Sequence, residues 1–127
     1  MIKNEMLVRK EIKRLDRETG LDTSKLYIKI NGRFTRCLGR FEFVAYPKDN
    51  SYEPCGFQFG KKFLETATEE EILEVTQHEY AHYVQHELYG YHRGMKPHGE
   101  EFQNACELIN CKDRGATREL KNPITRK

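Results

Sequence analysis

The longest helical pattern of apolar residues in the chain lies between Thr68 and Gly90. Thr68 and Glu71 have the spacing of a capping box, in which each side chain binds a free backbone N–H at a helix start. No proline or glycine interrupts the stretch before Gly90. Apolar side chains fall on most sides of this helix; they are Ile72, Leu73, Val75, Tyr80, Ala81, Tyr83, Val84 and Leu88. The pattern predicts a long helix that is buried on most sides.

Two further stretches have the spacing of amphipathic helices. Residues 3–19 place Val8 and Ile12 on one apolar stripe, and a glycine follows as a suitable cap. A second stripe begins at His98 and continues through Phe102 at the same helical interval. We therefore expect one helix at the N-terminus and another after the long helix, with His98 at the head of its buried face.

Three short segments alternate with a period of two and are predicted to be strands. They cover residues 26–30, 40–46 and 56–60, and turn-forming residues such as Asn31-Gly32 and Pro47 lie between them. Three strands joined by short turns predict a small antiparallel sheet whose apolar face packs on the helices. The expected fold class is α+β.

The chain is long enough for one domain with a modest core. Helical and strand patterns extend from residue 1 to about residue 115, and we expect this stretch to be the folded domain. The patterns are lost over residues 116–127, where Asn122-Pro123 closes any further helical turn. We expect residues 116–127 to form a mobile tail.

The composition is that of a soluble protein. Hydrophobic residues make up 37% of the chain and charged residues 33%, with a formal net charge of +2. No apolar run approaches the length of a membrane span, and residues 1–5 lack the apolar core of a signal peptide. The four cysteines form no CxxC pair and are expected to be packed thiols in a reducing compartment. We expect a cytoplasmic protein that does not bind membranes and is a monomer by default.

An HExxH motif, His78 to His82, lies in the middle of the predicted long helix. Residues four apart project from one face of a helix, so both imidazoles can bind a single metal ion. Glu79 is offset by one residue, which puts its carboxylate near a metal-bound water without making it a ligand. The motif predicts one zinc ion per chain, with Glu79 as the general base.

A catalytic zinc site takes three protein ligands, so a third donor must come from another segment. His86 shares the helical face of His78 but lies about 12 Å further along the axis, which is too far for one ion. His98 heads the apolar stripe of the following helix and is the preferred candidate. Three alternatives stay open: His92, Glu101 and Glu107.

Together these segments resemble the SprT-like zinc metalloprotease family. The resemblance rests on the HExxH motif, on residues 98–102 (HGEEF) after a glycine-containing connection, and on residues 32–40, which are similar to the start of a family strand. It covers roughly residues 1–115. The order and spacing of the three segments are more specific than the HExxH motif alone.

The resemblance implies a zincin-like metalloprotease fold in which Glu79 is the catalytic base. It also implies that three histidines bind the zinc ion; these are His78, His82 and His98. SprT-like proteases act on proteins that are bound or crosslinked to DNA, so DNA is an expected partner and the nucleoid an expected location. Many members carry a zinc ribbon after the protease domain, and this chain departs from them in that respect.

Other segments offer candidates for contacts with substrate or DNA. The turn after the long helix holds three candidates for contacts with substrate or with a developing oxyanion; they are Tyr91, His92 and Arg93. Basic residues that could bind phosphates lie on the first helix and between the first two strands; they are Lys10, Arg14, Arg17, Arg33, Arg36 and Arg40. A solvent-exposed basic face, or ion pairs with the many glutamates, is the alternative interpretation.

Three other functions compete for the same motif. A zinc-dependent nuclease could use several histidines, but it would not need Glu79. Peptide deformylase shares the Gln-His-Glu sequence, but residues 36–39 match its cysteine motif poorly. A latent module with structural zinc could bind DNA or protein, yet an inert site needs no glutamate beside an open metal position. The sequence therefore favours zinc-assisted hydrolysis of peptide bonds.

Overall fold

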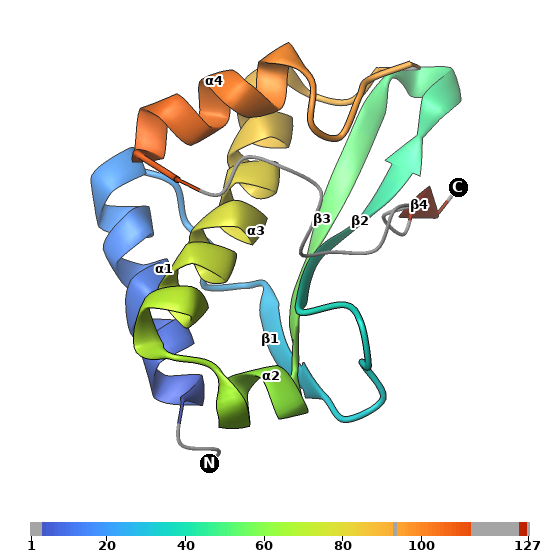
Figure 1. The fold of residues 1–127 in the computed structure, drawn as a ribbon. Helices are drawn as coiled ribbons and strands as arrows, with labels where there is room; N and C mark the ends of the chain where they lie inside the picture. Colours follow the sequence, from blue (N-terminus) through green and yellow to red (C-terminus); the bar gives the residue numbers. More distant parts are fainter. Residues whose placement is uncertain (1–3, 93, 113–124, 127) are drawn as a thin grey trace.

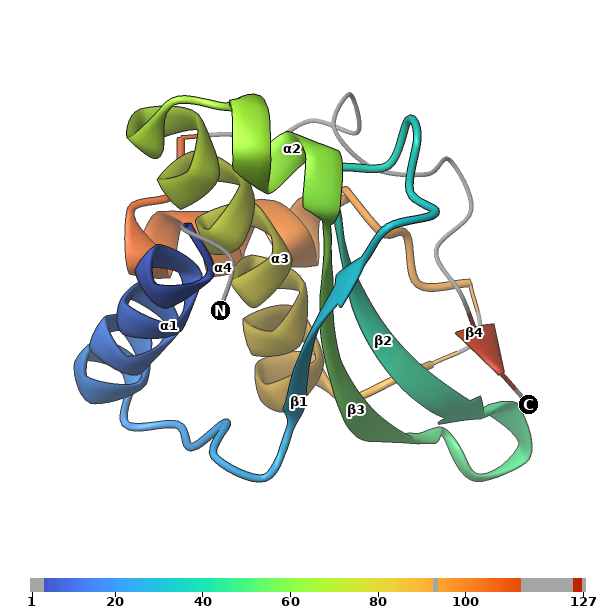
Figure 2. The ribbon, with the colours of Figure 1, turned by 90° about the horizontal axis from the view of Figure 1, so that it is seen from below.

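Helices and sheet form two layers in the computed structural model, which describes residues 4–92, 94–112 and 125–126. The helices are α1 (Glu5–Thr19), α2 (Lys61–Thr66), α3 (Glu69–Tyr89) and α4 (Glu100–Ile109). The strands are β1 (Tyr27–Asn31), β2 (Gly39–Tyr46), β3 (Ser51–Gly60) and β4 (Thr125–Arg126), with a short 3-10 helix, η1 (Pro47–Asp49), between β2 and β3. Figures 1 and 2 show the helices gathered on one face of the sheet. The predicted α+β class is confirmed.

The sheet is mixed, and the prediction of an antiparallel sheet was wrong. The strand order is β1-β3-β2-β4, in which β2 and β3 form an antiparallel hairpin but β1 pairs with β3 in parallel. Alternation identifies a strand without identifying its neighbour. The connection over residues 32–38 is long enough to carry the chain past the end of β3 before β2 begins. β3, with Phe57 and Phe59 fully buried, therefore becomes the central strand.

β3 is longer than the predicted strand at residues 56–60. It begins at Ser51 and includes Pro54, which lies opposite Phe43 beside an irregularity in register. A proline has no N–H to donate, and it is tolerated at a bulge or where no strand pairs on that side. β1 pairs with β3 only from Gly56 onward. Because a proline argues against a strand in sequence-based prediction, the first half of β3 was not predicted.

The predicted helices agree with the structure apart from their ends. α1 begins at Glu5, and residues 1–3 lie outside the described part. α3 spans Glu69–Tyr89, as the capping box and Gly90 predict. α2 was not predicted, because a helix of this length contains too few positions to establish a period.

The tail expected over residues 116–127 falls mostly outside the described residues. Thr125–Arg126 forms β4, which pairs in parallel with Phe43 and Val44 of β2. The domain limit at residue 115 and the mobility of the tail stay predictions. None of the helices in the described part is long and apolar enough to cross a membrane.

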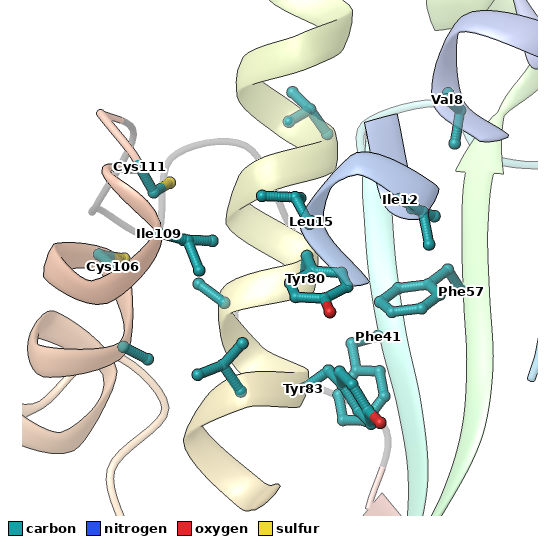
Figure 3. Packing of buried hydrophobic residues seen from close by; sticks show 14 of the residues in the cluster. Val8, Ile12, Leu15, Phe41, Phe57, Tyr80, Tyr83, Cys106, Ile109 and Cys111 are labelled. Carbon is teal, nitrogen blue, oxygen red and sulfur yellow. The ribbon is translucent and has the colours of Figure 1, made fainter. Parts of the chain in front are cut away.

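α3 lies between the sheet and α1, and Tyr80 is at the centre of this packing (Figure 3). Its fully buried ring stacks on Phe57 with centroids 6.4 Å apart. Burial raises the pKa of Tyr80, so its hydroxyl keeps its proton and donates to Asp16 Oδ1 at 2.7 Å. Asp16 Oδ2 in turn accepts from the Thr23 hydroxyl at 2.8 Å. These contacts hold α3 between α1 and the sheet.

The cysteines are all free thiols. Three of them are buried and one is half-buried; the buried ones are Cys37, Cys106 and Cys111. Figure 3 shows Cys106 and Cys111 in the apolar packing around α4. This agrees with the expectation of packed thiols without disulfides.

Candidate metal centre

α3 carries two of the candidate ligands and the candidate base. The predicted capping box is present: Thr68 Oγ1 accepts from the Glu71 N–H at 3.1 Å, and the Glu71 carboxylate accepts from the Thr68 N–H at 2.9 Å. The helix then continues without interruption, so His78 and His82 lie one turn apart with Glu79 beside them. All three side chains are buried, and those of His78 and Glu79 are buried completely.

The third histidine lies in a turn and not on a helix. α4 begins at Glu100 with Gly99 as its N-cap, so His98 precedes the helix that it was expected to head. The Gly99 N–H donates to the carbonyl of Lys96 at 3.4 Å, and the carbonyl of His98 accepts from the Gln103 side chain at 3.4 Å. A Cβ at Gly99 would lie only 3.0 Å from the Cβ of Lys96. Glycine therefore allows the tight turn that presents His98.

The turn before α4 is held by both flanking helices. Gln85 of α3 is fully buried, and its Nε2 donates to the carbonyl of Lys96 at 3.2 Å. On the other side, His92 Nε2 lies 3.1 Å from Glu101 Oε2 of α4. These contacts restrict the movement of the turn, which keeps His98 close to the ligands on α3.

The three histidines form a cluster whose dimensions fit a zinc ion. One ring nitrogen from each lies within 4.8 Å of the other two, and Nε2 of His78 is 3.3 Å from Nε2 of His98. Two nitrogens bound tetrahedrally to one zinc ion, each at about 2.0–2.1 Å, lie about 3.4 Å apart. The pair is therefore already at the separation that a shared ion requires. Imidazole nitrogens are also among the preferred donors for zinc.

The alternative third ligands lie outside this cluster. Glu101 contacts His92, as described above, and Glu107 is exposed on α4. Within the described residues, the three histidines are the one group of three or more potential ligands that could hold a metal ion. The structure thus brings together the residues that the sequence suggested as ligands, His78, His82 and His98.

His86 is buried in an aromatic cluster, away from the group of three. Its ring centroid lies 4.4 Å from that of Phe43 and 5.0 Å from that of Tyr52. Burial lowers the pKa of His86 to about 4, although its Nδ1 contact with the carbonyl of Gly90 at 3.3 Å opposes this effect. His86 is therefore neutral at pH 7. Its ring packs against aromatic side chains and does not belong to the group of potential metal ligands.

Glu79 is buried against the first residue of β2. A Cβ at Gly39 would lie 3.2 Å from Cγ of Glu79 and 3.0 Å from Cγ1 of Val75. The Cys37 thiol donates to the carbonyl of Gly39 at 3.1 Å and supports the strand there. Sequence reasoning identified Gly39 only as part of a family-like segment, because a contact between distant segments leaves no local pattern. The missing side chain lets the strand approach the candidate base closely.

The candidates for substrate or oxyanion contacts have different surroundings. Tyr91 is partly buried, with its ring 6.3 Å from that of His86. His92 is exposed and contacts Glu101. Arg93 lies outside the described residues. A catalytic role for any of these residues stays a prediction.

Two of the candidates for DNA contact form ion pairs, and one of these two, Arg14, is also exposed. Arg14 forms ion pairs with Glu11 and Glu18 on α1. Arg40 lies 3.6 Å from Glu42, and its side chain is mostly buried. For Arg14 and Arg40 the structure therefore agrees with the alternative interpretation, in which these arginines form ion pairs with glutamates. The other candidates are exposed; they are Lys10, Arg17, Arg33 and Arg36.

Two lysines that sequence reasoning missed lie near the exposed arginines of the loop. The Gly60 N–H donates to the carbonyl of Leu38 at 2.9 Å, so the loop at residues 32–38 packs against the start of α2. Lys61 and Lys62 are exposed there. We call this region the basic end of the sheet; it consists of Arg33, Arg36, Lys61 and Lys62. The sequence did not indicate that these lysines and the two arginines lie at the same end of the sheet, because they belong to different segments.

Comparisons with known proteins agree with this geometry. A search of curated proteins found no match, and a search of solved structures found none either. The family model described as SprT-like matches residues 7–125, which include the HExxH helix, the turn with His98 and the family-like segment before β2. Because the match covers nearly the whole sequence, the chain belongs to the SprT-like family.

Proposed function

We propose that the chain is a zinc-dependent metalloendopeptidase. SprT-like proteins are generally zinc metalloproteases. The observation that carries the proposal is the cluster of three histidines beside a buried glutamate, with two ligand nitrogens already 3.3 Å apart. A structural zinc site has four protein ligands, whereas three protein ligands leave one position for water. The donor set of the described residues therefore supports a catalytic site over a structural one.

The residues of the site have distinct tasks in this proposal. A zinc ion held by the three histidines would act as a Lewis acid that acidifies a water molecule and polarises the scissile carbonyl. Glu79 lies beside His78 on α3, where its carboxylate would accept the proton of that water and pass it to the leaving amine. The absence of a side chain at Gly39 leaves room for the glutamate beside the start of β2.

β2 offers a backbone edge to a peptide substrate. Its inner edge pairs with β3 along the whole strand, whereas among the described residues its outer edge pairs only at Phe43 and Val44. Gly39, at the start of that strand, contacts Glu79. An extended peptide that adds to this edge would be held by main-chain hydrogen bonds, which do not read side chains. We therefore expect weak sequence preference in cleavage.

We further propose that the substrates are proteins associated with DNA. The loop that carries Arg33 and Arg36 leads directly into Gly39, which lies against the candidate base. A local cluster of positive charge binds phosphates even where the net charge of the molecule is small, and this binding weakens as salt increases. DNA bound there would bring the proteins attached to it close to the metal centre.

The test is cleavage of a histone by the native chain and by Glu79→Gln, with zinc present, in the presence and absence of single-stranded DNA. We expect the variant to keep its zinc and its fold and to lose hydrolysis by about 10²- to 10⁴-fold, because a general base is removed. We expect DNA to stimulate the native chain and high salt to abolish the stimulation.

The other possible outcomes identify the competing functions. Full cleavage by Glu79→Gln contradicts the role of Glu79. Degradation of the added DNA, with the histone intact, indicates a nuclease. No cleavage despite one bound zinc ion per chain indicates a latent module that binds DNA or protein. If the histone is cleaved at the same rate with and without DNA, the chain is a protease, but the proposal that its substrates are associated with DNA is contradicted.

A further inference from the structure

Phe102 contacts all three candidate zinc ligands. Its ring centroid lies 5.1 Å from that of His78, 4.3 Å from that of His82 and 4.9 Å from that of His98. The ring is stacked on His82, with an interplanar angle of 29°, and is edge-on to His98, with an angle of 81°. Phe102 has no exposed surface. One aromatic ring therefore supports the whole ligand set.

This contact joins two segments that are far apart in the sequence. His78 and His82 are on α3, whereas His98 is in the turn before α4, and Phe102 lies in the first turn of α4. Aromatic rings attract each other most in offset-stacked or edge-on arrangements with centroids about 4.5–7 Å apart. The contacts with His78 and His98 fall in this range and the stacked contact with His82 is slightly closer, at 4.3 Å, so Phe102 favours one orientation for each imidazole.

Fixed orientations matter for metal binding. A free imidazole can rotate, and holding it for coordination costs conformational entropy unless the protein has already restricted it. Apolar surroundings also limit the access of water to the metal–ligand bonds. A residue that restricts the rotation of the imidazoles and also excludes water from the metal–ligand bonds raises metal affinity without touching the metal itself.

We propose that Phe102 is a positioning residue that sets the geometry of the zinc ligands, beyond its part in the core. This inference rests on the proposed zinc site. It assigns to Phe102 a role that the helical stripe alone did not suggest, since the stripe identifies only a buried position. The ring acts through His78, His82 and His98.

Metal binding and spectroscopy test this role without relying on catalytic activity. Phe102→Leu should lower the zinc affinity about tenfold in competition with a chelator, comparable to the loss of other residues that orient ligands. The visible absorption spectrum of the cobalt(II)-loaded variant should change in position and intensity, because the ligand geometry is no longer fixed. Phe102→Met fills a similar volume without an aromatic face. It should keep the fold and show the same changes.

Phe57→Leu is the matched control. Phe57 is also fully buried, and its ring contacts are with Phe41 at 5.4 Å and with Tyr80 and Tyr83 at 6.4 Å, none of which is a candidate ligand. It should lower the melting temperature and leave the cobalt(II) spectrum and zinc affinity unchanged. Native affinity and a native spectrum in both Phe102 variants would overturn the inference, as would equal losses of affinity in Phe57→Leu. A native chain that binds no zinc would overturn the proposed function itself.

Discussion

His82 and His86 lie one helical turn apart on α3 and are equally buried, each with 7% of its surface exposed. Their neighbours nevertheless give them different chemistry. His82 faces two further imidazoles, with ring centroids 5.0 Å away at His78 and 4.9 Å away at His98. His86 faces the aromatic rings of Phe43 and others, and burial lowers its pKa to about 4.

The difference shows that residue type, helical face and burial together do not define a metal ligand. A ligand also needs partners that converge on one point, and for His82 these come from the turn before α4. His86 lies on the same side of α3, but there it contacts aromatic rings of the β2–β3 hairpin. These contacts include no further imidazole and no carboxylate.

The largest effect is expected from His98→Ala, compared with His86→Phe. Loss of a ligand should exceed the roughly 10- to 100-fold cost of losing a residue that only orients ligands. We therefore expect His98→Ala to lower zinc affinity by more than about 100-fold and His86→Phe to leave it unchanged. Competition with a chelator measures both. Equal losses in the two variants would mean that the clusters are not distinct.

His86→Phe should instead change how stability depends on pH. The pKa of His86 is about 4 in the folded chain because of burial, below its ordinary value of 6.5. Its neutral form therefore contributes stability that is fully present above pH 6.5 and is lost as the pH falls towards 4. This loss amounts to about 3 kcal/mol.

Urea unfolding of the native chain and of His86→Phe at several pH values measures the effect. Both proteins contain the same metal ligands, so the difference between the two curves isolates His86. We expect the native chain to lose stability relative to the variant between pH 6.5 and pH 4. Parallel curves over that range would contradict the assignment.

Gly39→Ala tests the approach of β2 to the metal side of α3. The new Cβ would meet Val75 Cγ1 at 3.0 Å and Glu79 Cγ at 3.2 Å, so the glutamate must shift. A small displacement of a catalytic group is expensive, and we expect kcat to fall about tenfold with KM and zinc content unchanged. Gly32→Ala is the control, because nothing lies within 4 Å of its added Cβ. Equal kcat values in the two variants would remove the role of Gly39.

The smallest effect is expected from Gln85→Leu, on the helix between the two clusters. Gln85 Nε2 donates to the carbonyl of Lys96, but its buried Oε1 has no hydrogen-bond partner within the described structure. Replacement therefore removes one hydrogen bond and also one buried polar atom, and stability should change by less than about 1 kcal/mol.

Amide hydrogen exchange shows where Gln85→Leu acts. We expect faster exchange in the turn at residues 94–99, because the tie to α3 is lost. Gln77→Leu is the control on the same helix, since Gln77 Nε2 donates to Glu11 Oε2 at 2.7 Å on the side of α1. If both variants change exchange in the turn equally, Gln85 does not hold it.

The sequence predicted the local elements and most of the candidate site. Thr68, Glu71 and Gly90 marked the ends of α3, and the HExxH spacing put His78 and His82 on one face. These features depend on residues within one or two helical turns, where backbone geometry is fixed. His98 was suggested as the third ligand, and the structure places it beside the other two histidines, although in a turn and not on α4.

Tertiary structure alone decided how the segments meet. It placed β1 beside β3 in parallel, put Gly39 against Glu79, gathered the basic end of the sheet, and set Phe102 against three histidines. Apart from the contact between His98 and Phe102, none of these contacts joins near neighbours in the sequence, so no local period records them. The sequence determined which side chains each element presents, because helical and strand geometry are local. Packing determined which of those side chains face one another, because burial of apolar surface has no preferred partner.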